Sequence, residues 1–453
     1  MKKWLFALCL VLMVAGLAFS GEWKFKDAVV VGRPEATDGG EAKVNCLGFK
    51  NAYGVAVDPD GNVWFASYYR RAYSVYDAAG KATTVYRDNV VQTRPGKPDT
   101  LIGTIPIFVL KTDGTIDSLK FLTLPDGKID TLKAGPGANG TWGNRGMDTD
   151  PRGNIIVAQY DVLYQIDYKT YSVLNKYKLP GQSTRPAVDS SGYVYSLPLA
   201  GGTMNILDPD LFMVYNSIPN ITVTSRSVAV TPDAKQVFVA SLGAGAYRYV
   251  SAQGVDGTYA IADTILKKVR NLTAAVNFMQ WDPKGLLWLA SVEEQASPFM
   301  WAVDPNNNFA VVDSTSFKWA KFNLTDTTKP AWPRRGYNQP WLLRAPRDAA
   351  FSPDGKTMYI ADMYGFTIKA YEYVETGNPV TFKVNMGIQE QLGKFNPATD
   401  KVVVRGSFNG WAGNNDELKL GATAKVYEGT VNIPDTEVGK EHYYKFVIVA
   451  AAG

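Results

Sequence analysis

The length, composition and charge of the chain exclude several classes of protein. Its 453 residues include 47 basic and 43 acidic side chains without a long run of one sign, so we expect no nucleic-acid partner. Of its two cysteines, Cys9 lies in an apolar leader, which leaves Cys46 without an internal disulfide partner. No segment after the leader has the long apolar run of a membrane helix, so we expect no membrane span in the mature chain.

The first twenty residues have the pattern of a signal peptide. Lys2 and Lys3 precede an uncharged, largely apolar stretch, and small side chains follow just before Gly21, where a signal peptidase would cleave. The apolar stretch is too short to cross a bilayer securely. The sequence therefore predicts a signal peptide over residues 1–20 and a secreted or extracytoplasmic protein, located in a periplasm or at a cell surface.

A motif that returns six times organises most of the chain. In each copy an apolar alternation leads into a turn with Pro, Asp or Gly and continues into a second alternation, which is the pattern of a β-hairpin. The copies span residues 52–67, 144–159, 184–197, 225–241, 276–291 and 346–362.

A third strand that ends in an acid follows most of these copies, and a short fourth strand comes after it. The acids are Asp77, Asp167, Asp208, Asp304 and Glu372. Four antiparallel strands in each unit, repeated every roughly 40 to 50 residues, are typical of β-propeller blades.

The spacing of the copies predicts an all-β fold with a six-bladed β-propeller over residues 21–376. Two intervals are longer than one blade. The first holds turns at Asp113-Gly114 and Asp126-Gly127, which we interpret as an insertion, with a seventh blade as the less favoured alternative. The last copy leaves room for three strands, and residues 23–31 alternate well enough to supply the fourth and close the ring.

These copies resemble the NHL and gluconolactonase-like propeller repeats, over about 350 of the 453 residues. The resemblance implies the fold and leaves the function open, since such propellers include lyases, lactonases, sensors and scaffolds. Related enzymes hold zinc through histidines, or calcium through oxygen ligands, in the axial channel. The single histidine, His442, lies outside the predicted propeller, which argues against zinc or histidine chemistry there.

Acids recur in the hairpin turns and would be the first candidates for calcium ligands. They are Asp58, Asp150, Asp189 and Asp282. An Asp at such a position accepts hydrogen bonds from its own turn, so we interpret these residues as structural. A calcium site elsewhere stays open, although the sequence does not locate one, and we expect no other cofactor.

Arginines recur just before the first strand of the motif. Arg145, Arg226 and Arg347 occupy matching positions, and Arg185 is displaced by one. The chain enters the innermost strand here, near the channel mouth, where several guanidinium groups would attract a carboxylate or sulfate. In the alternative interpretation, each arginine pairs with a turn acid of a neighbouring blade.

The long loop before the last copy offers another candidate surface. Trp332, Tyr337 and Trp341 stand near Arg334 and Arg335 there. Exposed aromatic side chains beside arginines can line a groove for a sugar or a peptide. They can equally cover one face of the propeller, and the sequence does not decide between the two.

The repeat stops near residue 376, and residues 377–453 show four alternating strands typical of an immunoglobulin-like β-sandwich. This segment resembles the glycogen- and starch-binding β-sandwich modules in its residues 405–411 (RGSFNGW) and 442–446 (HYYKF). The resemblance implies that Trp411 stacks on glucose units and that Lys445 contacts hydroxyl groups, with Asn409 at the rim.

In an alternative interpretation, Trp411 only caps the sandwich. The closing strands of that family would lie beyond Gly453, so we expect a truncated sandwich and a chain that continues.

Two functions from different classes remain. The first is a secreted, non-catalytic binding or scaffold protein, whose partner is a polysaccharide of the α-glucan kind or an extracellular protein. The second is a calcium-dependent lactonase-like hydrolase. We favour the first, because it needs only surfaces that the sequence shows.

Overall fold

The computed structural model describes residues 21–31, 51–70, 72–76, 78–79, 81–86, 88–94, 97–135, 143–243, 245–266, 268–269, 272–273, 275–291, 300–314, 345–363, 367–375, 377–411, 413–414, 416–433 and 441–450. The predicted signal peptide, Cys46 and the aromatic loop with Trp332, Tyr337 and Trp341 lie outside these residues. Within them, no helix is long and apolar enough to cross a membrane. The chain forms two compact units, one over Lys24–Glu372 and one that includes Tyr373–Gly453.

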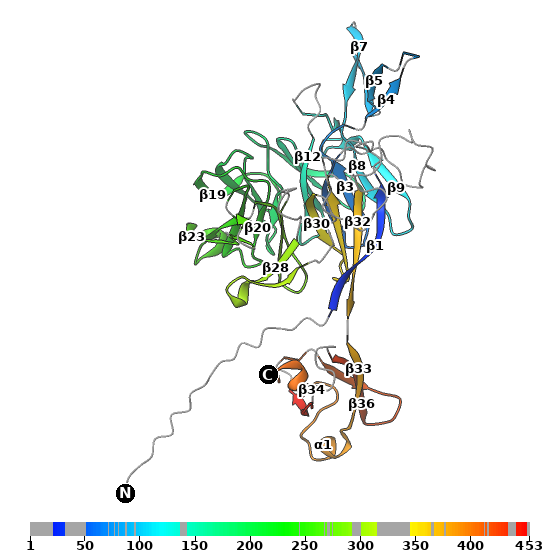
Figure 1. Ribbon diagram of the computed structural model, residues 1–453, viewed down its shortest axis with the longest axis vertical. Helices are drawn as coiled ribbons and strands as arrows, with labels where there is room; N and C mark the ends of the chain where they lie inside the picture. Colours follow the sequence, from blue (N-terminus) through cyan, green and yellow to red (C-terminus); the bar gives the residue numbers. More distant parts are fainter. Residues whose placement is uncertain are drawn as a thin grey trace. The chain divides into compact units, whose positions relative to one another are not determined.

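Six four-stranded antiparallel sheets make up the first unit in the part that the structure describes, and they form a β-propeller (Figure 1). Four of these blades follow the chain strand by strand, as the hairpin motif predicts. Their strands are β12 (Asn144–Thr149), β13 (Ile155–Gln159), β14 (Val162–Ile166), β15 (Val173–Lys178), β16 (Ala187–Val188), β17 (Val194–Ser196), β18 (Gly202–Leu207), β19 (Val214–Ile221), β20 (Val228–Val230), β21 (Gln236–Ser241), β22 (Gly245–Val250), β23 (Ala260–Ile265), β26 (Val276–Trp281), β27 (Leu287–Ser291), β28 (Met300–Asp304) and β29 (Ala310–Ser314).

The last blade takes its outermost strand from the beginning of the chain. It pairs β1 (Gly21–Val31) with β32 (Thr367–Glu375), which continues to β31 (Thr357–Asp362) and β30 (Pro346–Phe351). The prediction that residues 23–31 supply this strand is confirmed. Such closure covers strand edges that would otherwise be open for pairing with another chain.

The first blade differs from its prediction. It consists of β2 (Ala52–Val57), β3 (Val63–Ser67), β8 (Ile107–Leu110) and β9 (Ile116–Leu119). The prediction that the third strand ends at Asp77 is wrong, because β4 (Ala72–Tyr76) forms a separate two-stranded sheet with β5 (Ala82–Tyr86). The true third strand is an unbroken apolar segment whose Phe108 stacks on Phe65, with ring centroids 5.5 Å apart.

The insertion of the first blade therefore lies earlier in the chain than predicted. It contains the β4–β5 hairpin and a second hairpin of β6 (Asn89–Arg94) and β7 (Lys97–Gly103). The turn at Asp113-Gly114 belongs to the blade itself, between β8 and β9. Only the turn at Asp126-Gly127 makes an extra hairpin, of β10 (Phe121–Thr123) and β11 (Ile129–Thr131). Another short hairpin joins β24 (Lys268–Val269) to β25 (Leu272–Thr273).

The recurring acids hold the hairpin turns. Asp58 accepts hydrogen bonds from the backbone N–H groups of Asp60 and Asn62, at 3.0 and 2.9 Å, and from Trp64 Nε1 at 2.9 Å. Asp150, Asp189 and Asp282 accept backbone N–H groups at the same positions of their own turns. The prediction that these four acids are structural is confirmed.

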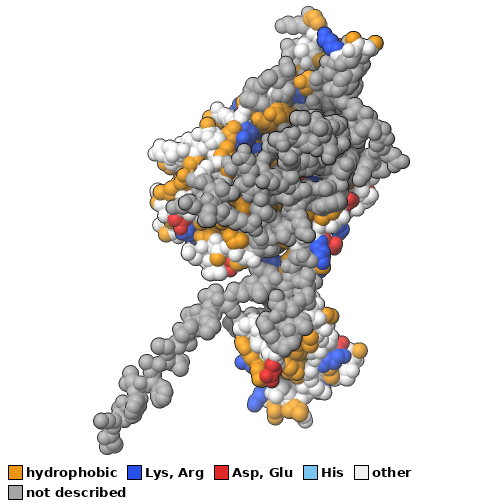
Figure 2. Space-filling view, in the orientation of Figure 1, with side chains coloured by type: hydrophobic (Ala, Val, Ile, Leu, Met, Phe, Trp, Pro, Cys, Tyr) orange, Lys and Arg blue, Asp and Glu red, His pale blue; other side chains and the backbone are white. Residues whose placement is uncertain are grey.

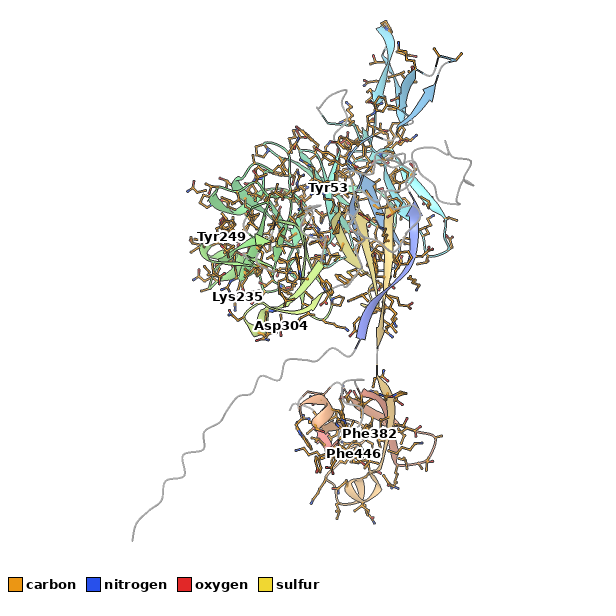
Figure 3. The ribbon with its side chains drawn as sticks, viewed as in Figure 1. Tyr53, Lys235, Tyr249, Asp304, Phe382 and Phe446 are labelled. Atoms are coloured by element: carbon orange, nitrogen blue, oxygen red, sulfur yellow. The ribbon has the colours of Figure 1, made fainter. Side chains whose placement is uncertain are left out.

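The second unit is one curved five-stranded sheet, in the order β33 (Asn378–Asn385), β36 (Val426–Ile433), β35 (Glu417–Leu420), β34 (Lys401–Gly406) and β37 (Tyr444–Val449), with the short helix α1 (Gly387–Gln391). The sheet folds over one core, so that Phe382 of β33 lies 4.9 Å from Tyr444 of β37 between ring centroids. Figure 3 shows Phe382 and Phe446 on the inside of this unit. All four predicted strands are present, and β35 joins them.

Candidate functional site

Each blade contributes one residue next to the start of its innermost strand, at the same point of the repeat in five blades and displaced by one position in the third. These residues are Tyr53, Arg145, Arg185, Arg226, Asn277 and Arg347. In four blades the pairing register slips at this point, between Ala52 and Gly54, Asn144 and Gly146, Val276 and Phe278, and Pro346 and Asp348. The skipped residue is the extra member of a β-bulge, a device that turns a side chain out of the regular alternation.

Three guanidinium groups from three blades surround the side chain of Tyr53. Arg226 Nη1 donates a hydrogen bond to the Tyr53 hydroxyl at 3.1 Å. The guanidinium carbons of Arg145 and Arg347 lie 5.9 and 5.7 Å from the centroid of its ring. Figure 3 shows Tyr53 in the interior of the propeller. We call these four residues the arginine–tyrosine cluster.

The arginine–tyrosine cluster is largely buried, with Arg226 half-buried, and it brings three positively charged side chains to one tyrosine. Tyr53, Arg145 and Arg347 expose 3%, 1% and 6% of their surface. Burial raises the pKa of Tyr53, but Arg347, Arg145 and Arg226 together lower it by more, so the pKa ends below its usual value. For every other described tyrosine with a shifted pKa, the shift is upward. At Tyr53, the positive charges of the three arginines therefore outweigh the effect of burial.

Arg145 has hydrogen-bonding capacity that the protein does not use. Its Nη2 donates to Gln182 Oε1, and its guanidinium carbon lies 4.8 Å from the ring centroid of Tyr68. Its Nε and Nη1 atoms are buried without a hydrogen-bond partner among the residues that the structure describes. A buried donor without an acceptor costs roughly 1–3 kcal/mol, and more when the group is charged. An acceptor supplied by a ligand would remove this cost.

Arg347 and Asn277 support one another at the same level of the propeller. Arg347 Nη1 donates to Asn277 Oδ1, so the residue from the fifth blade orients the arginine of the sixth. Neither Tyr53 nor Asn277 was predicted from the sequence. The signal was present, since both occupy the position of the arginines when the six copies are compared column by column.

Arg185 lies in a different environment from the other three arginines. It is 1% exposed, with its Nε 2.5 Å from Asp348 Oδ1 and its Nη2 3.4 Å from Asp148 Oδ1. Asp348 Oδ2 also accepts the backbone N–H groups of Val55 and Met147, each at 3.1 Å. We call Arg185, Asp148 and Asp348 the axial ion-pair cluster. It joins the first, second, third and sixth blades.

The axial ion-pair cluster is electrostatically self-contained. Burial lowers the pKa of Arg185, but Asp348 and Asp148 raise it by more. Burial raises the pKa of Asp348 to about 6, although Arg185 and two backbone N–H groups favour the charged form. Arg185 is thus paired with acids of other blades, as in the alternative interpretation of the sequence, although Asp148 and Asp348 lie in strands β12 and β30 and not in the hairpin turns.

The carboxylates of the axial ion-pair cluster already accept hydrogen bonds from the protein, so fewer of their oxygen atoms are left to bind a calcium ion. Asp348 accepts two backbone N–H groups from other blades and the guanidinium of Arg185. Asp148 Oδ2 accepts the N–H of Val188 at 3.0 Å. Among the described residues, no group of three or more His, Cys, Asp or Glu side chains could hold a metal ion.

The second unit brings two of its three predicted sugar-contacting residues together. Lys445 Nζ lies 5.6 Å from the centroid of the Trp411 ring, and Trp411 is 43% exposed. Asn409 instead serves the loop, since its Oδ1 accepts the N–H of Gly406 at 2.7 Å and its Nδ2 donates to Asp416 Oδ2 at 2.7 Å. Its amide group fixes the turn that carries Trp411.

Trp411 has an unusual backbone conformation for a large residue. Its φ angle is 61°, in the left-handed region, and its N–H donates to Gly406 O at 2.9 Å. Such a conformation costs a bulky residue about 1–2 kcal/mol, whereas glycine adopts it freely. The turn therefore holds an exposed indole where a glycine would fit more easily.

The fold and these sites define an all-β protein with a propeller and a second unit built on one five-stranded sheet. No family model matches the chain, and no curated protein matches it. Among solved structures, the chain is similar to a streptogramin B lyase at 12% identity and a TM-score of 0.43, over 79% of this chain and 100% of that one.

Two further solved structures are similar to a comparable degree. A virginiamycin B lyase from Staphylococcus aureus matches at 13% identity and a TM-score of 0.39, over 72% of this chain and 96% of that one. A catalytically inactive variant of that lyase with quinupristin matches at 12% identity and a TM-score of 0.40, over 73% and 98%. At these levels of similarity, the function has to be argued from the residues of the chain itself.

Proposed function

We propose that this protein is a secreted, non-catalytic binding protein whose propeller holds a small oxyanion, of the carboxylate or sulfate kind, in the arginine–tyrosine cluster. The observation that carries the proposal is the convergence of three guanidinium groups on Tyr53: Arg226 Nη1 donates to its hydroxyl at 3.1 Å, and the guanidinium carbons of Arg145 and Arg347 lie 5.9 and 5.7 Å from its ring centroid. The lowered pKa of Tyr53 agrees with this concentration of positive charge. A guanidinium group holds an oxyanion through two parallel hydrogen bonds. Arg145 offers Nε and Nη1 for this purpose.

Charge complementarity explains why an anion is the ligand and a cation or neutral molecule is not. Buried charges are stable when they are paired, and an anion would pair with guanidinium groups from three blades at once. The bulges that aim Arg145 and Arg347 toward Tyr53 fix these groups before a ligand arrives. A site that is organised in advance loses less conformational entropy on binding.

Calorimetric titration with sodium sulfate and sodium acetate, at an ionic strength kept constant with chloride, tests this proposal. We expect saturable binding of at least one anion and a loss of about tenfold or more in affinity for Arg145→Met, since a hydrogen bond to a charged group contributes about 1.5–3 kcal/mol. Arg248→Gln is the matched control, because Arg248 is paired with Asp263 at 2.7 Å.

Two results would contradict the proposal. One is equal binding by the wild type and Arg145→Met, which would mean a general effect of salt. The other is calcium-dependent opening of an aldonolactone by the wild-type protein that chelation abolishes, which would favour the hydrolase alternative.

For the second unit, we propose that Trp411 and Lys445 contact a glucan chain. The strained turn supports this, because it holds an exposed indole beside an ammonium group at a structural cost. A flat indole covers the apolar face of a pyranose, and the ammonium group donates to its hydroxyls. Other apolar side chains also lie on the surface of this unit (Figure 2), so exposure alone does not single out Trp411.

Affinity electrophoresis in glycogen or starch gels tests the glucan proposal with Trp411→Gly. The glycine relieves the left-handed strain, so we expect a free energy of unfolding within about 1 kcal/mol of the wild type. The same substitution removes the stacking surface, so we expect retardation in the gel to disappear. Wild-type protein that migrates without retardation, or Trp411→Gly that is still retarded, would contradict the proposal.

A further inference from the structure

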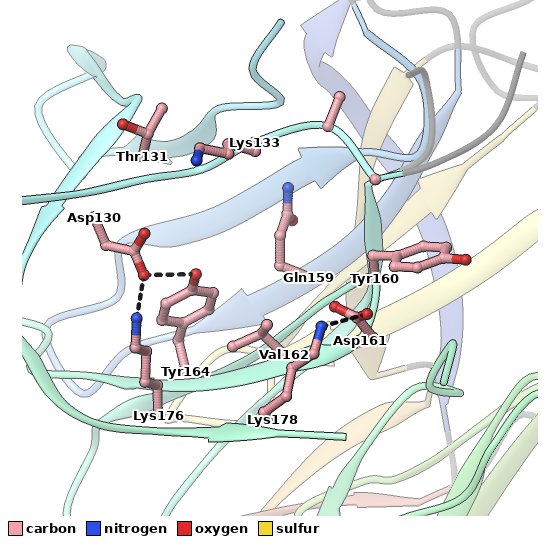
Figure 4. A pocket seen from close by; sticks show the side chains of 12 residues that line it. Asp130, Thr131, Lys133, Gln159, Tyr160, Asp161, Val162, Tyr164, Lys176 and Lys178 are labelled. Atoms are coloured by element: carbon pink, nitrogen blue, oxygen red, sulfur yellow. Dashed lines mark hydrogen bonds and ion pairs between the residues drawn. The ribbon is translucent and has the colours of Figure 1, made fainter. Parts of the chain in front are cut away.

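A cavity of about 470 Å³ lies between the β10–β11 hairpin and the second blade, and it shares no residue with the arginine–tyrosine cluster (Figure 4). Its volume falls within the range of about 300–1,000 Å³ that is usual for small-molecule sites. One wall comes from β11 and the residues after it. The other comes from the β13–β14 turn and from β15, the outermost strand of the blade.

Ion pairs fix the polar side chains of both walls. Lys176 Nζ lies 2.6 Å from Asp130 Oδ2, and Lys178 Nζ lies 2.5 Å from Asp161 Oδ2. Tyr164 OH donates to the same Asp130 oxygen at 3.1 Å. Burial, and after it the negative charge of Asp130, raises the pKa of Tyr164, which therefore stays a neutral hydrogen-bond donor. Figure 4 shows that Asp130 joins the two walls through Lys176 and Tyr164, and that Lys178 pairs with Asp161 within one wall.

The charges of the lining do not cancel. Two carboxylates, Asp130 and Asp161, face three lysines, and each carboxylate is already paired with one of them. The third, Lys133, lines the cavity with an exposed side chain and has no ion pair with any part of the chain that the structure describes. The cavity therefore has one positive charge to offer to a ligand.

Gln159 supplies an unused acceptor at the cavity. It is 4% exposed, and its Nε2 makes a long hydrogen bond of 3.4 Å to Ile105 O, while its Oε1 is buried without a partner in the described part of the chain. Figure 4 shows its amide extending into the space between the two walls. Such an acceptor requires a donor, and a ligand hydroxyl group is the simplest one.

The rim of the cavity is strained. Tyr160, the first residue of the β13–β14 turn, has a φ angle of 55°, which costs a bulky side chain about 1–2 kcal/mol. This conformation holds the Tyr160 ring at the edge of the cavity, next to Asp161. Strained residues that the surrounding structure retains are concentrated at binding sites.

We propose that this cavity binds a monoanionic sugar acid of the uronate kind. Lys133 pairs with the carboxylate of the ligand, and a ring hydroxyl donates to Gln159 Oε1. The unshared carboxylate oxygens and ammonium N–H groups of the two wall pairs accept from and donate to the remaining hydroxyls. A uronate thus offers one negative charge to Lys133 and several hydroxyl groups to the polar side chains that line the cavity.

Calorimetric titration of the full chain with sodium glucuronate, with glucose and acetate as the neutral and the bare-anion comparison, tests this proposal. We expect glucuronate to bind about tenfold or more tightly than either comparison compound. Lys133→Gln should remove the preference for glucuronate over glucose. Lys128→Gln is the matched control, an exposed lysine of the same hairpin that pairs with Asp126, and it should change nothing.

Gln159→Leu separates binding from folding. The leucine removes a buried acceptor without a partner, so we expect a melting temperature equal to or above that of the wild type, together with a loss of about fivefold or more in glucuronate affinity. Unchanged affinity in both Lys133→Gln and Gln159→Leu would overturn the proposal. Binding that only Arg145→Met abolishes would also overturn it, because the uronate would then occupy the arginine–tyrosine cluster.

Discussion

The axial ion-pair cluster and the arginine–tyrosine cluster both use arginines from beside the start of an innermost strand, and they reach opposite electrostatic states. In the first, one arginine, Arg185, faces the carboxylates of Asp148 and Asp348. In the second, three arginines face Tyr53, whose pKa falls. The difference shows that a repeated arginine is structural or available to a ligand according to the acids within its reach.

The local backbone distinguishes Arg185 from two of its counterparts. Arg145 and Arg347 are the extra residues of β-bulges, and the pairing of β16 with β17 contains no register shift. The pairing of β20 with β21 contains none either, so a missing bulge does not separate Arg185 from Arg226. What separates them is that the Arg185 side chain reaches Asp348 and Asp148, whereas Arg226 reaches the Tyr53 hydroxyl.

The largest expected effect is the loss of the arginine from the axial ion-pair cluster. Arg185→Met leaves two buried carboxylates without their cation, so we expect the free energy of unfolding to fall by about 3–5 kcal/mol. Urea denaturation measures it. The control Arg248→Gln, in a partly exposed pair, should cost less than about 1 kcal/mol. A loss that small for Arg185→Met as well would show that the cluster does not join the blades.

The next effect is a pH dependence that belongs to Asp348. Its pKa rises from 3.8 to about 6 on folding, so the native state keeps a proton that the unfolded chain releases between these values. The contribution of Asp348 to stability therefore falls as the pH rises from about 4 to about 6, by an amount on the order of 1–3 kcal/mol.

Urea denaturation of the wild type and Asp348→Asn at several pH values isolates this contribution. The stability of the wild type relative to the variant should decline across that interval. A relative stability that increases with pH would mean that ion pairing with Arg185 outweighs burial.

The smallest expected effect concerns an arginine of the arginine–tyrosine cluster. Arg145→Met removes one of three like charges and two unpartnered donors, so we expect the free energy of unfolding to change by less than about 1 kcal/mol or to rise. Thermal and urea denaturation in chloride buffer measure it. A cost similar to that of Arg185→Met would show that Arg145 is a structural residue.

The sequence predicted the propeller because its evidence is local. Each hairpin copy combines alternating strands with a turn whose Asp accepts its own backbone N–H groups, as Asp58 and Asp282 do. The third strand of the first blade was mispredicted at Asp77, since the alternating segment of β4 and the apolar segment of β8 could each be that strand. Packing against Phe65 decides between them in favour of the segment with Phe108.

The candidate site was predicted only in part. The column of arginines is visible in the sequence, but the acids that neutralise Arg185 come from the second and sixth blades. Asp348 is separated from Arg185 by 163 positions, a distance over which sequence patterns carry no information on pairing. Tyr53 was missed because attention to charge alone overlooks a neutral residue at the same position. The cavity at Gln159 depends on two segments meeting in space.

The pKa of Tyr53 is the measurement that tests the central claim most directly. NMR of protein whose tyrosines carry ¹³C at Cζ measures this pKa. The signal of Tyr53 is assigned by its absence from the spectrum of Tyr53→Phe. We predict a pKa below 10, with Arg347, Arg145 and Arg226 outweighing burial, and an upward shift when sulfate binds. A pKa above 10 that sulfate does not change would contradict the account, because burial would then dominate and the cluster would offer no positive charge to an anion.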